Sequence, residues 1–185
     1  APKDFHELED MLEFAVNLKK PVVIRYPRGG ENKEKFIKHE PIEEGKAEIL
    51  KEGKDISILA IGKTVARAMK IAEKLKEQDI DAEVINVRFL KPLDKETIKK
   101  SIEKTKNVIT IEDGTIINGL GTTIKELIVD EDIKDVKIKA YAYPDTFIQH
   151  GSVEELEKIY HLDEESIIKD LSEKHLTKAK DENTK

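Results

Sequence analysis

The sequence predicts an α/β fold with a mostly parallel sheet and helices on both faces. From about residue 47 onward, short apolar runs alternate with amphipathic stretches of about 10–15 residues, which is typical of parallel βαβ units. Residues 56–61 (ISILAI) are almost continuously apolar, as expected of a strand buried on both faces. Hydrophobic residues make up 38% of the chain and charged residues 39%, so a core of ordinary size is expected under a heavily charged surface.

The N-terminal residues show a different pattern. Residues 4–19 place apolar side chains three and four positions apart, which predicts a helix that ends before Pro21. Residues 21–26 (PVVIRY) predict a short strand. Residues 27–46 are polar, contain Gly and Pro and show no period, and they predict a connector between two bodies.

The later elements follow in order along the chain. We expect an edge strand at residues 47–50 and buried strands at 56–61, 82–87, 108–111 and 136–142. We expect helices at residues 64–78, 95–106, 121–129, 152–160 and 163–174. Asp94 precedes the second of these helices and is the expected N-cap. Residues 176–185 are charged and predict a disordered tail.

Composition excludes several classes of protein. Acids outnumber bases by 39 to 33, which gives no basic face for nucleic acid or an anionic membrane. Cysteine is absent, which removes disulfides and thiolate sites. No apolar run approaches the roughly 18 residues of a membrane span, and no signal peptide opens the chain. We therefore expect a cytoplasmic protein with no nucleic-acid or membrane partner. Because residue 1 is Ala and an amphipathic pattern follows almost at once, we also expect it to be part of a longer one.

Arginine is rare in this chain and is locally concentrated. Only four of the 33 cations are arginines, and Arg25 and Arg28 fall in one five-residue window, RYPRG. Arginine grips a phosphate or carboxylate in a fixed geometry that lysine does not provide. The pair indicates either an anion site or a structural salt bridge.

Two glycine-containing segments imitate nucleotide-binding motifs. Residues 61–64 (IGKT) lack the glycine that a P-loop needs at the position of Ser57, so we expect Gly62 to make a turn and Thr64 to cap the helix. Residues 119–121 (GLG) are followed by Ile124, where a dinucleotide fingerprint has glycine. We interpret these as tight-turn glycines, with an anion at the helix N-terminus as the alternative.

Other polar residues show no complete catalytic set. Glu112 and Asp113 are adjacent, so on a strand they point to opposite faces, and we expect a capping or interface role. The five histidines lack metal-ligand spacing. His150 lies in a loop before a helix and is a candidate without a visible partner; we interpret His6, His39, His161 and His175 as solvated or capping residues.

Read in order, the motifs resemble the 1-deoxy-D-xylulose-5-phosphate synthase family, thiamine-diphosphate enzymes of the transketolase superfamily. The resemblance rests on RYPRG at residues 25–29, on VRFLKPLD at 87–94 and on YPDTFIQHG at 143–151. The second motif is shared with transketolases and with 2-oxoacid dehydrogenase β subunits. The loop after Glu112 departs from the family pattern, with Asn118-Gly119 in place of Gly-Gly, and so does the residue pair before Pro144.

The resemblance implies a domain organisation and a reaction. Residues 1–40 would be the end of a pyrimidine-binding domain plus connector, 41–175 a transketolase C-terminal domain, and 176–185 a tail. The complete enzyme would join pyruvate and glyceraldehyde 3-phosphate with loss of carbon dioxide. Its thiamine diphosphate and Mg²⁺ sites would lie in the rest of the same polypeptide, so no cofactor, metal or catalytic residue is expected on this chain, which alone would be inactive.

The resemblance also implies a substrate-phosphate site and a homodimer. Arg28 would contact the phosphate of the sugar substrate, and Arg25 would have a secondary role, positioning the loop or forming an ion pair. A homodimer is expected, and the helix at 4–19 should pack on its own C-terminal domain or across the dimer. The alternatives are a subunit of a split transketolase or 2-oxoacid dehydrogenase, and a non-catalytic binding or regulatory module.

Overall fold

The structure is a computed structural model that describes residues 1–28, 36 and 40–175. Gly29, His39, half of the predicted connector (29–35 and 37–39) and the tail at 176–185 lie outside the described residues, as does the side chain of His175. Among the described residues, no helix combines the length and apolar character needed to cross a bilayer.

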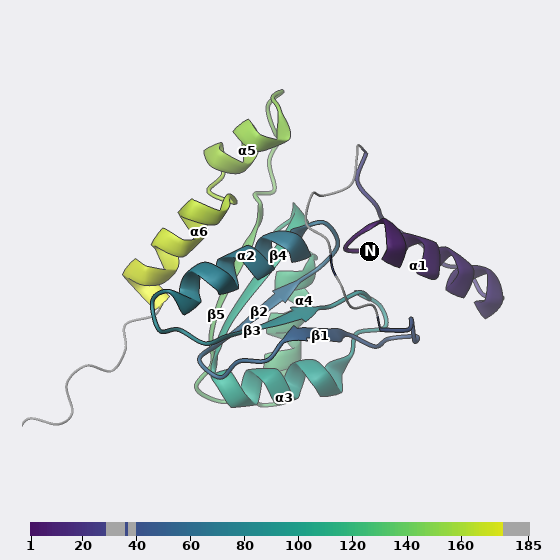
Figure 1. Cartoon of the computed structure of the whole chain (residues 1–185), viewed down its shortest axis with the longest axis horizontal. Coiled ribbons are helices and arrows are strands. Elements are labelled where there is room, and N and C mark those ends of the chain that lie inside the picture. Colours follow the sequence, from purple (N-terminus) through teal and green to yellow (C-terminus); the bar gives the residue numbers. More distant parts are fainter. Residues whose placement is uncertain (29–35, 37–39, 176–185) are drawn as a thin grey trace, which may run out of the picture.

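A five-stranded sheet forms the centre of the molecule, in the order β1-β3-β2-β4-β5 (Figure 1). The strands are β1 (Glu48–Lys51), β2 (Ile56–Ala60), β3 (Ala82–Asn86), β4 (Asn107–Thr115) and β5 (Lys137–Tyr143). All neighbouring pairs are parallel except β1 and β3. The predicted mostly parallel sheet is confirmed, with the predicted edge strand as its one antiparallel member.

Helices cover both faces of the sheet. They are α2 (Thr64–Lys76), α3 (Lys95–Thr105), α4 (Leu120–Asp130), α5 (Val153–Ile159) and α6 (Glu164–Asp170), with α6 continuing as a π-helical turn (Leu171–His175). Alternate residues of β2 point to opposite faces, as a strand requires: Ile58 packs with the apolar residues of α2 and α6, and Leu59 with those of α3 and α4. The predicted helices on both faces are therefore confirmed.

The N-terminal helix α1 (Phe5–Leu18) lies beside the sheet domain. Asp4 caps it, since its side chain accepts a hydrogen bond from the Glu7 backbone N–H at 2.8 Å. Met11 is buried and the Phe14 ring meets Phe89 edge-on, with 5.9 Å between centroids. The structure shows α1 packed on its own chain, which is one of the two predicted arrangements. Packing across a dimer stays a prediction.

The strand predicted at residues 21–26 is wrong. These residues are extended, but none of them belongs to a strand, and no described strand pairs with them. Val23 is 94% exposed and Tyr26 63% exposed. The β-branched residues favour a strand, but a strand also needs a neighbouring strand to bond with its backbone groups. Without one, these groups form hydrogen bonds with water.

Two predicted turn and cap roles need correction. Gly62 makes the predicted turn with φ of +66°, but the N-cap of α2 is Lys63. Thr64 instead donates from Oγ1 to the carbonyls of Ile61 and Ile111, at 2.9 and 2.8 Å. Gly121 has no left-handed φ; a Cβ there would lie 2.5 Å from the Ala140 Cβ, so close helix–strand approach, rather than a tight turn, requires this glycine.

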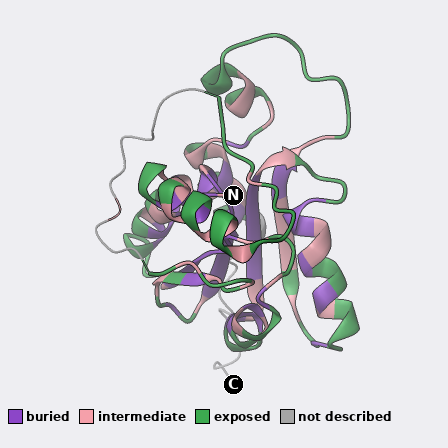
Figure 2. Cartoon of the chain, turned by 90° about the vertical axis from the view of Figure 1, so that its right-hand side faces the viewer, coloured by how far each residue is buried: buried purple, intermediate pink, exposed green. Residues whose placement is uncertain are grey.

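The segment from Pro144 to α5 projects from the body as an arm (Figures 1 and 2). None of the α5 residues is buried, and the side chain of Phe147 is fully exposed. A capping box between Ser152 and Glu155 fixes the start of the helix. The predicted helix at 152–160 is therefore present, but local capping rather than core packing holds it.

Candidate functional site

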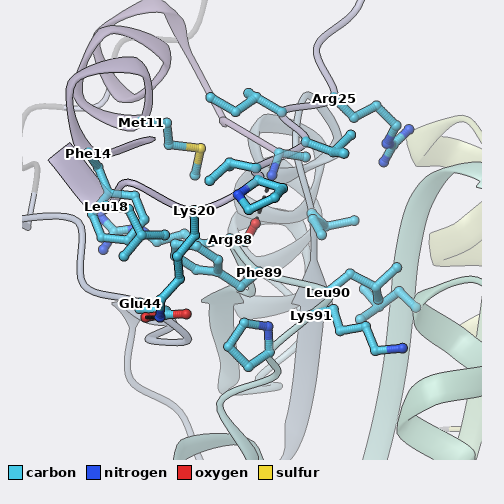
Figure 3. A pocket seen from close by; sticks show the side chains of 18 of the residues that line it. Met11, Phe14, Leu18, Lys20, Arg25, Glu44, Arg88, Phe89, Leu90 and Lys91 are labelled. Carbon is cyan, nitrogen blue, oxygen red and sulfur yellow. Dashed lines mark hydrogen bonds and ion pairs between the residues drawn. The ribbon is translucent and has the colours of Figure 1, made fainter. Parts of the chain in front are cut away.

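A cavity of about 530 Å³ lies between α1 and the carboxyl edge of the parallel strands (Figure 3). Ligands of open α/β sheets bind at this edge. Most of the lining is apolar and comes from α1, from residues 21–24 and from the segment that follows β3. The charged groups on the lining are Lys20, Arg25, Glu44, Arg88, Lys91 and Glu112.

Arg25 and Arg28 lie differently with respect to this cavity. Arg25 lines it, and its Nη1 donates a hydrogen bond to the Asp113 carbonyl at 2.6 Å. The role of Arg25 in positioning the loop stays a prediction. Arg28 is exposed and is not among the lining residues, so the structure brings only one of the two predicted arginines to the cavity.

A buried cluster of charged groups joins α1 to the sheet behind the cavity. The Arg88 Nε lies 2.7 Å from Oε1 of Glu7, and its Nη2 lies 3.2 Å from Oε2 of Glu48. The Lys3 Nζ lies 3.2 Å from Glu7 and 2.8 Å from Glu48. Asn86 donates to both carboxylates. All five side chains are at most 4% exposed, so this polar cluster is held almost without water.

The cluster lowers the pKa of Glu48. Burial alone would raise the pKa of this carboxyl, but the hydrogen bond from Lys3 and the charges of Arg88 and Lys3 outweigh burial and hold the pKa below its usual value. A carboxyl with a lowered folded-state pKa stabilises the fold fully above its unfolded pKa of about 4.3, and that contribution disappears as pH falls through the folded value.

We therefore expect the free energy of unfolding to fall as the pH is lowered below about 4.3, with part of that loss due to Glu48. Urea denaturation of the wild type and of Glu48→Gln across pH 3–7 measures this contribution. The difference between the two proteins should shrink toward acid pH. A constant difference would show that ionisation of Glu48 does not contribute.

Of the capping or interface role predicted for the acidic pair in β4, the structure shows capping by Glu112. Glu112 accepts a hydrogen bond from the Gly121 backbone N–H at the start of α4, at 3.1 Å. A Cβ on Gly119 would lie 2.3 Å from the same carboxylate, so glycine at that position lets Glu112 reach the helix. Asp113 pairs with Lys63 at 3.1 Å. Both acids lie within β4, which runs four residues beyond the predicted strand.

The histidines form no site in the described part of the chain. His150 is exposed on the arm before α5 and is not among the residues that line the cavity. His6 lies 3.2 Å from Asp10 on the exposed surface of α1. Within residues 1–28, 36 and 40–175, no group of three or more His, Asp or Glu side chains is arranged to hold a metal ion.

Arg88 is the residue that sequence reasoning missed. It lines the cavity, is 2% exposed and has a left-handed backbone with φ of +55°, a strained conformation that clusters at functional sites. Two signals pointed to it: it is one of only four arginines, and it directly follows a strand at the carboxyl edge. Its carboxylate partner Glu7 lies 81 positions away, which no local pattern reveals.

Comparison with known proteins confirms the predicted resemblance. The chain is 44% identical over 169 residues to the 1-deoxy-D-xylulose-5-phosphate synthase of Halothermothrix orenii, covering 91% of this chain and 27% of that protein. It is 40% identical over 174 residues to the synthase of Clostridium tetani, covering 92% of this chain and 27% of that protein. The chain thus spans about a quarter of the length of these curated relatives.

Solved structures and a family match agree with this result. A structure titled "Split gene transketolase, inactive beta4 tetramer" is similar with a TM-score of 0.84 and 28% identity, over 93% of this chain and 55% of that one. A transketolase from Campylobacter jejuni shares the fold, with a TM-score of 0.52 at 17% identity, over 70% of this chain and 19% of that one. Residues 45–167 match the family described as transketolase, C-terminal domain. The chain belongs to the transketolase C-terminal domain family.

Proposed function

We propose that this chain is the C-terminal part of a 1-deoxy-D-xylulose-5-phosphate synthase, which condenses pyruvate with glyceraldehyde 3-phosphate and releases carbon dioxide. The observation that carries the proposal is 40–45% identity to synthases of this name over most of the chain. Residues 1–40 are then the end of the pyrimidine-binding domain with its connector, and residues 41–175 the C-terminal domain. A cytoplasmic location stays a prediction from the sequence.

The cofactor of the complete enzyme does not fit the residues described here. Thiamine diphosphate bound through Mg²⁺ needs oxygen ligands around the metal, and the described residues hold no such group of acids. In this proposal the cofactor and its metal bind to other parts of the longer polypeptide, and they supply the carbon–carbon bond chemistry there. This chain contributes substrate binding and partner contacts.

The 185-residue chain alone should show no turnover. The assay contains both substrates, thiamine diphosphate and Mg²⁺, and it measures release of carbon dioxide. Addition of the missing upstream polypeptide as a separate chain is the positive control. Robust turnover by the chain alone would overturn the proposal that it is a part of the enzyme.

The substrate phosphate is proposed to bind to Arg28, with Arg25 in a secondary role. A phosphate dianion suits the planar donor fork of arginine. The exposed position of Arg28 leaves its guanidinium open to solvent, whereas Arg25 lies on the cavity wall. We therefore expect substitution of the two arginines to affect KM differently. A direct comparison of Arg28→Ala and Arg25→Ala tests this.

In the full-length enzyme, Arg28→Ala should raise KM for glyceraldehyde 3-phosphate about tenfold or more, since hydrogen bonds to a charged group contribute about 1.5–3 kcal/mol. Arg25→Ala should have a smaller effect, and kcat should change little in both. Lys76→Ala removes an exposed cation on α2 and is the matched control. A larger effect at Arg25 would transfer the principal role to it, and no effect at either arginine would contradict the phosphate site.

Exposed apolar side chains support a partner that covers α1 and the segment after it. Leu12, Val16 and Val23 are 51%, 78% and 94% exposed, and exposed apolar patches of this kind mark interaction surfaces. We assign this surface to the rest of the same polypeptide and to a homodimer. Sedimentation of the full-length enzyme should give a dimer. A monomer would contradict the proposed homodimer.

A second candidate function is a subunit of a split transketolase. The similar structure with the highest coverage given above is titled as a split-gene transketolase, which favours this alternative over a 2-oxoacid dehydrogenase subunit or a non-catalytic binding module. The coding sequence upstream of Ala1 distinguishes the candidates. A continuous reading frame with the cofactor motif supports the synthase, and a start codon directly before the Ala1 codon, with no cofactor motif, supports the split form.

A further inference from the structure

The cavity has two walls from distant parts of the chain. α1 and residues 20–25 form one wall, and residues 88–92 form the other. Apolar contact between the walls is made by the buried Met11 and by Phe14, which meets Phe89 edge-on, while Leu12 and Val16 on α1 are largely exposed. The ion cluster defined above is thus a main connection between the two walls.

We propose that Glu7 is a positioning residue, which holds the guanidinium of Arg88 in place and so sets the separation of the two cavity walls. The cluster of Lys3, Glu7, Glu48, Asn86 and Arg88 then acts as a latch between the two walls of the cavity. The expected effect of the latch on substrate binding rests on the function proposed above. The expected effect of the latch on the position of α1 does not.

Glu7 is the hub of the latch. Its carboxylate accepts hydrogen bonds from the Arg88 Nε at 2.7 Å, the Asn86 Nδ2 at 2.9 Å and the Lys3 backbone N–H at 2.6 Å. Its own backbone N–H is fixed by the Asp4 cap. The first turn of α1 therefore fixes the position of the Glu7 carboxylate, and the carboxylate in turn fixes the position of the Arg88 guanidinium.

The other donors of Arg88 complete its orientation. Nη2 donates to the Glu40 carbonyl at 2.8 Å, and Nη1 donates to the Pro41 carbonyl at 3.2 Å. These contacts hold the guanidinium from the side of the sheet domain, and Glu7 holds it from the side of α1. A planar guanidinium with fixed donors at three nitrogens cannot rotate without breaking several hydrogen bonds.

Removing the Glu7 carboxylate unbalances the charges of the latch. The cluster contains two cations and two carboxylates, at most 4% exposed. Glu7→Gln keeps the shape but leaves Lys3 and Arg88 with Glu48 alone, and an uncompensated buried charge is unfavourable. Only Glu7 and Met11 of α1 are buried, so we expect the variant to relieve this charge by outward movement of α1, which admits water.

Hydrogen–deuterium exchange of the 185-residue chain tests the latch. In Glu7→Gln, the amides of residues 8–18 should exchange about tenfold faster or more, while those of β2 and β3 keep their protection. Glu9→Gln is the matched control, because Glu9 is an exposed acid on the same helix, and its exchange should stay close to wild type. Equal exchange in the two variants would overturn the latch. Loss of protection in β2 and β3 as well would also overturn it, since the cluster would then belong to the global core.

Steady-state kinetics of the full-length enzyme test the effect on the ligand. Glu7→Gln should raise KM for the phosphorylated substrate more than it lowers kcat, whereas a variant that only reduces the folded fraction lowers kcat alone. If Arg25→Ala and Arg28→Ala raise KM and Glu7→Gln does not, the positioning role is wrong and the proposed phosphate site stands. If none of the three variants changes KM, the proposed phosphate site fails, while faster exchange in α1 still supports the latch.

Discussion

Arg88→Met should lower the free energy of unfolding of the chain by about 3–5 kcal/mol, the usual cost of removing one partner from a buried ion pair. Methionine fills much of the same space, but Glu7 and Glu48 would then face Lys3 alone, and the carbonyls of Glu40 and Pro41 would lose their donors. Urea denaturation followed by circular dichroism measures the change.

Arg67→Met is the control for this prediction. Arg67 pairs with Glu157 at 2.5 Å, but both side chains are about 15% exposed, so water can replace the lost partner. We expect a smaller loss than for Arg88→Met, because this pair keeps some contact with solvent and Lys63 still lies 4.0 Å from Glu157. Equal losses in the two variants would show that burial of the Arg88 cluster has no special effect.

Gly53→Ala should be the other strongly destabilising substitution. Gly53 lies between β1 and β2, and a Cβ there would come within 2.2 Å of the Ala82 carbonyl carbon and 2.3 Å of the Glu83 nitrogen. These atoms belong to the backbone of β3, so the strand itself would have to move. We expect a loss of about 3 kcal/mol in the free energy of unfolding, at the upper end for overpacking.

Gly114→Ala is the matched control for Gly53→Ala. A Cβ on Gly114 would lie 3.4 Å from the Glu112 Oε2, which is an ordinary contact with a side chain that can adjust. Neither glycine has a left-handed φ, so backbone strain does not separate the two variants. A mild effect at both positions would contradict the predicted clash in β3.

The sheet and its helices could be predicted because their signals are local. Apolar runs, helical spacing and the Asp94 cap each depend on a few neighbouring residues, and Asp94 does accept the Thr97 backbone N–H. The strand at residues 21–26 failed for the opposite reason, because a strand also needs a neighbour that is far away in the sequence. Thr64 failed as a cap because a buried hydroxyl found two carbonyl acceptors instead.

The candidate site was predictable only in part. The RYPRG window drew attention to Arg25, which does line the cavity. No motif or spacing distinguishes Lys3, Glu7 or Glu48: the first two lie at the start of the predicted helix and the third in the predicted edge strand. Their burial depends on how α1 meets β1 and β3, and that three-way contact leaves no period or motif in the sequence.

The polar character of the contact between α1 and the sheet has a consequence for protein engineering. An apolar contact accepts many similar residues, but this one needs opposite charges at matching positions on two segments. A chimaera that takes residues 1–28 from one relative and the sheet domain from another should therefore fold well only if Lys3 and Glu7 arrive together with partners equivalent to Glu48, Asn86 and Arg88. For this chain, compatibility of a grafted N-terminal segment then depends on these five positions.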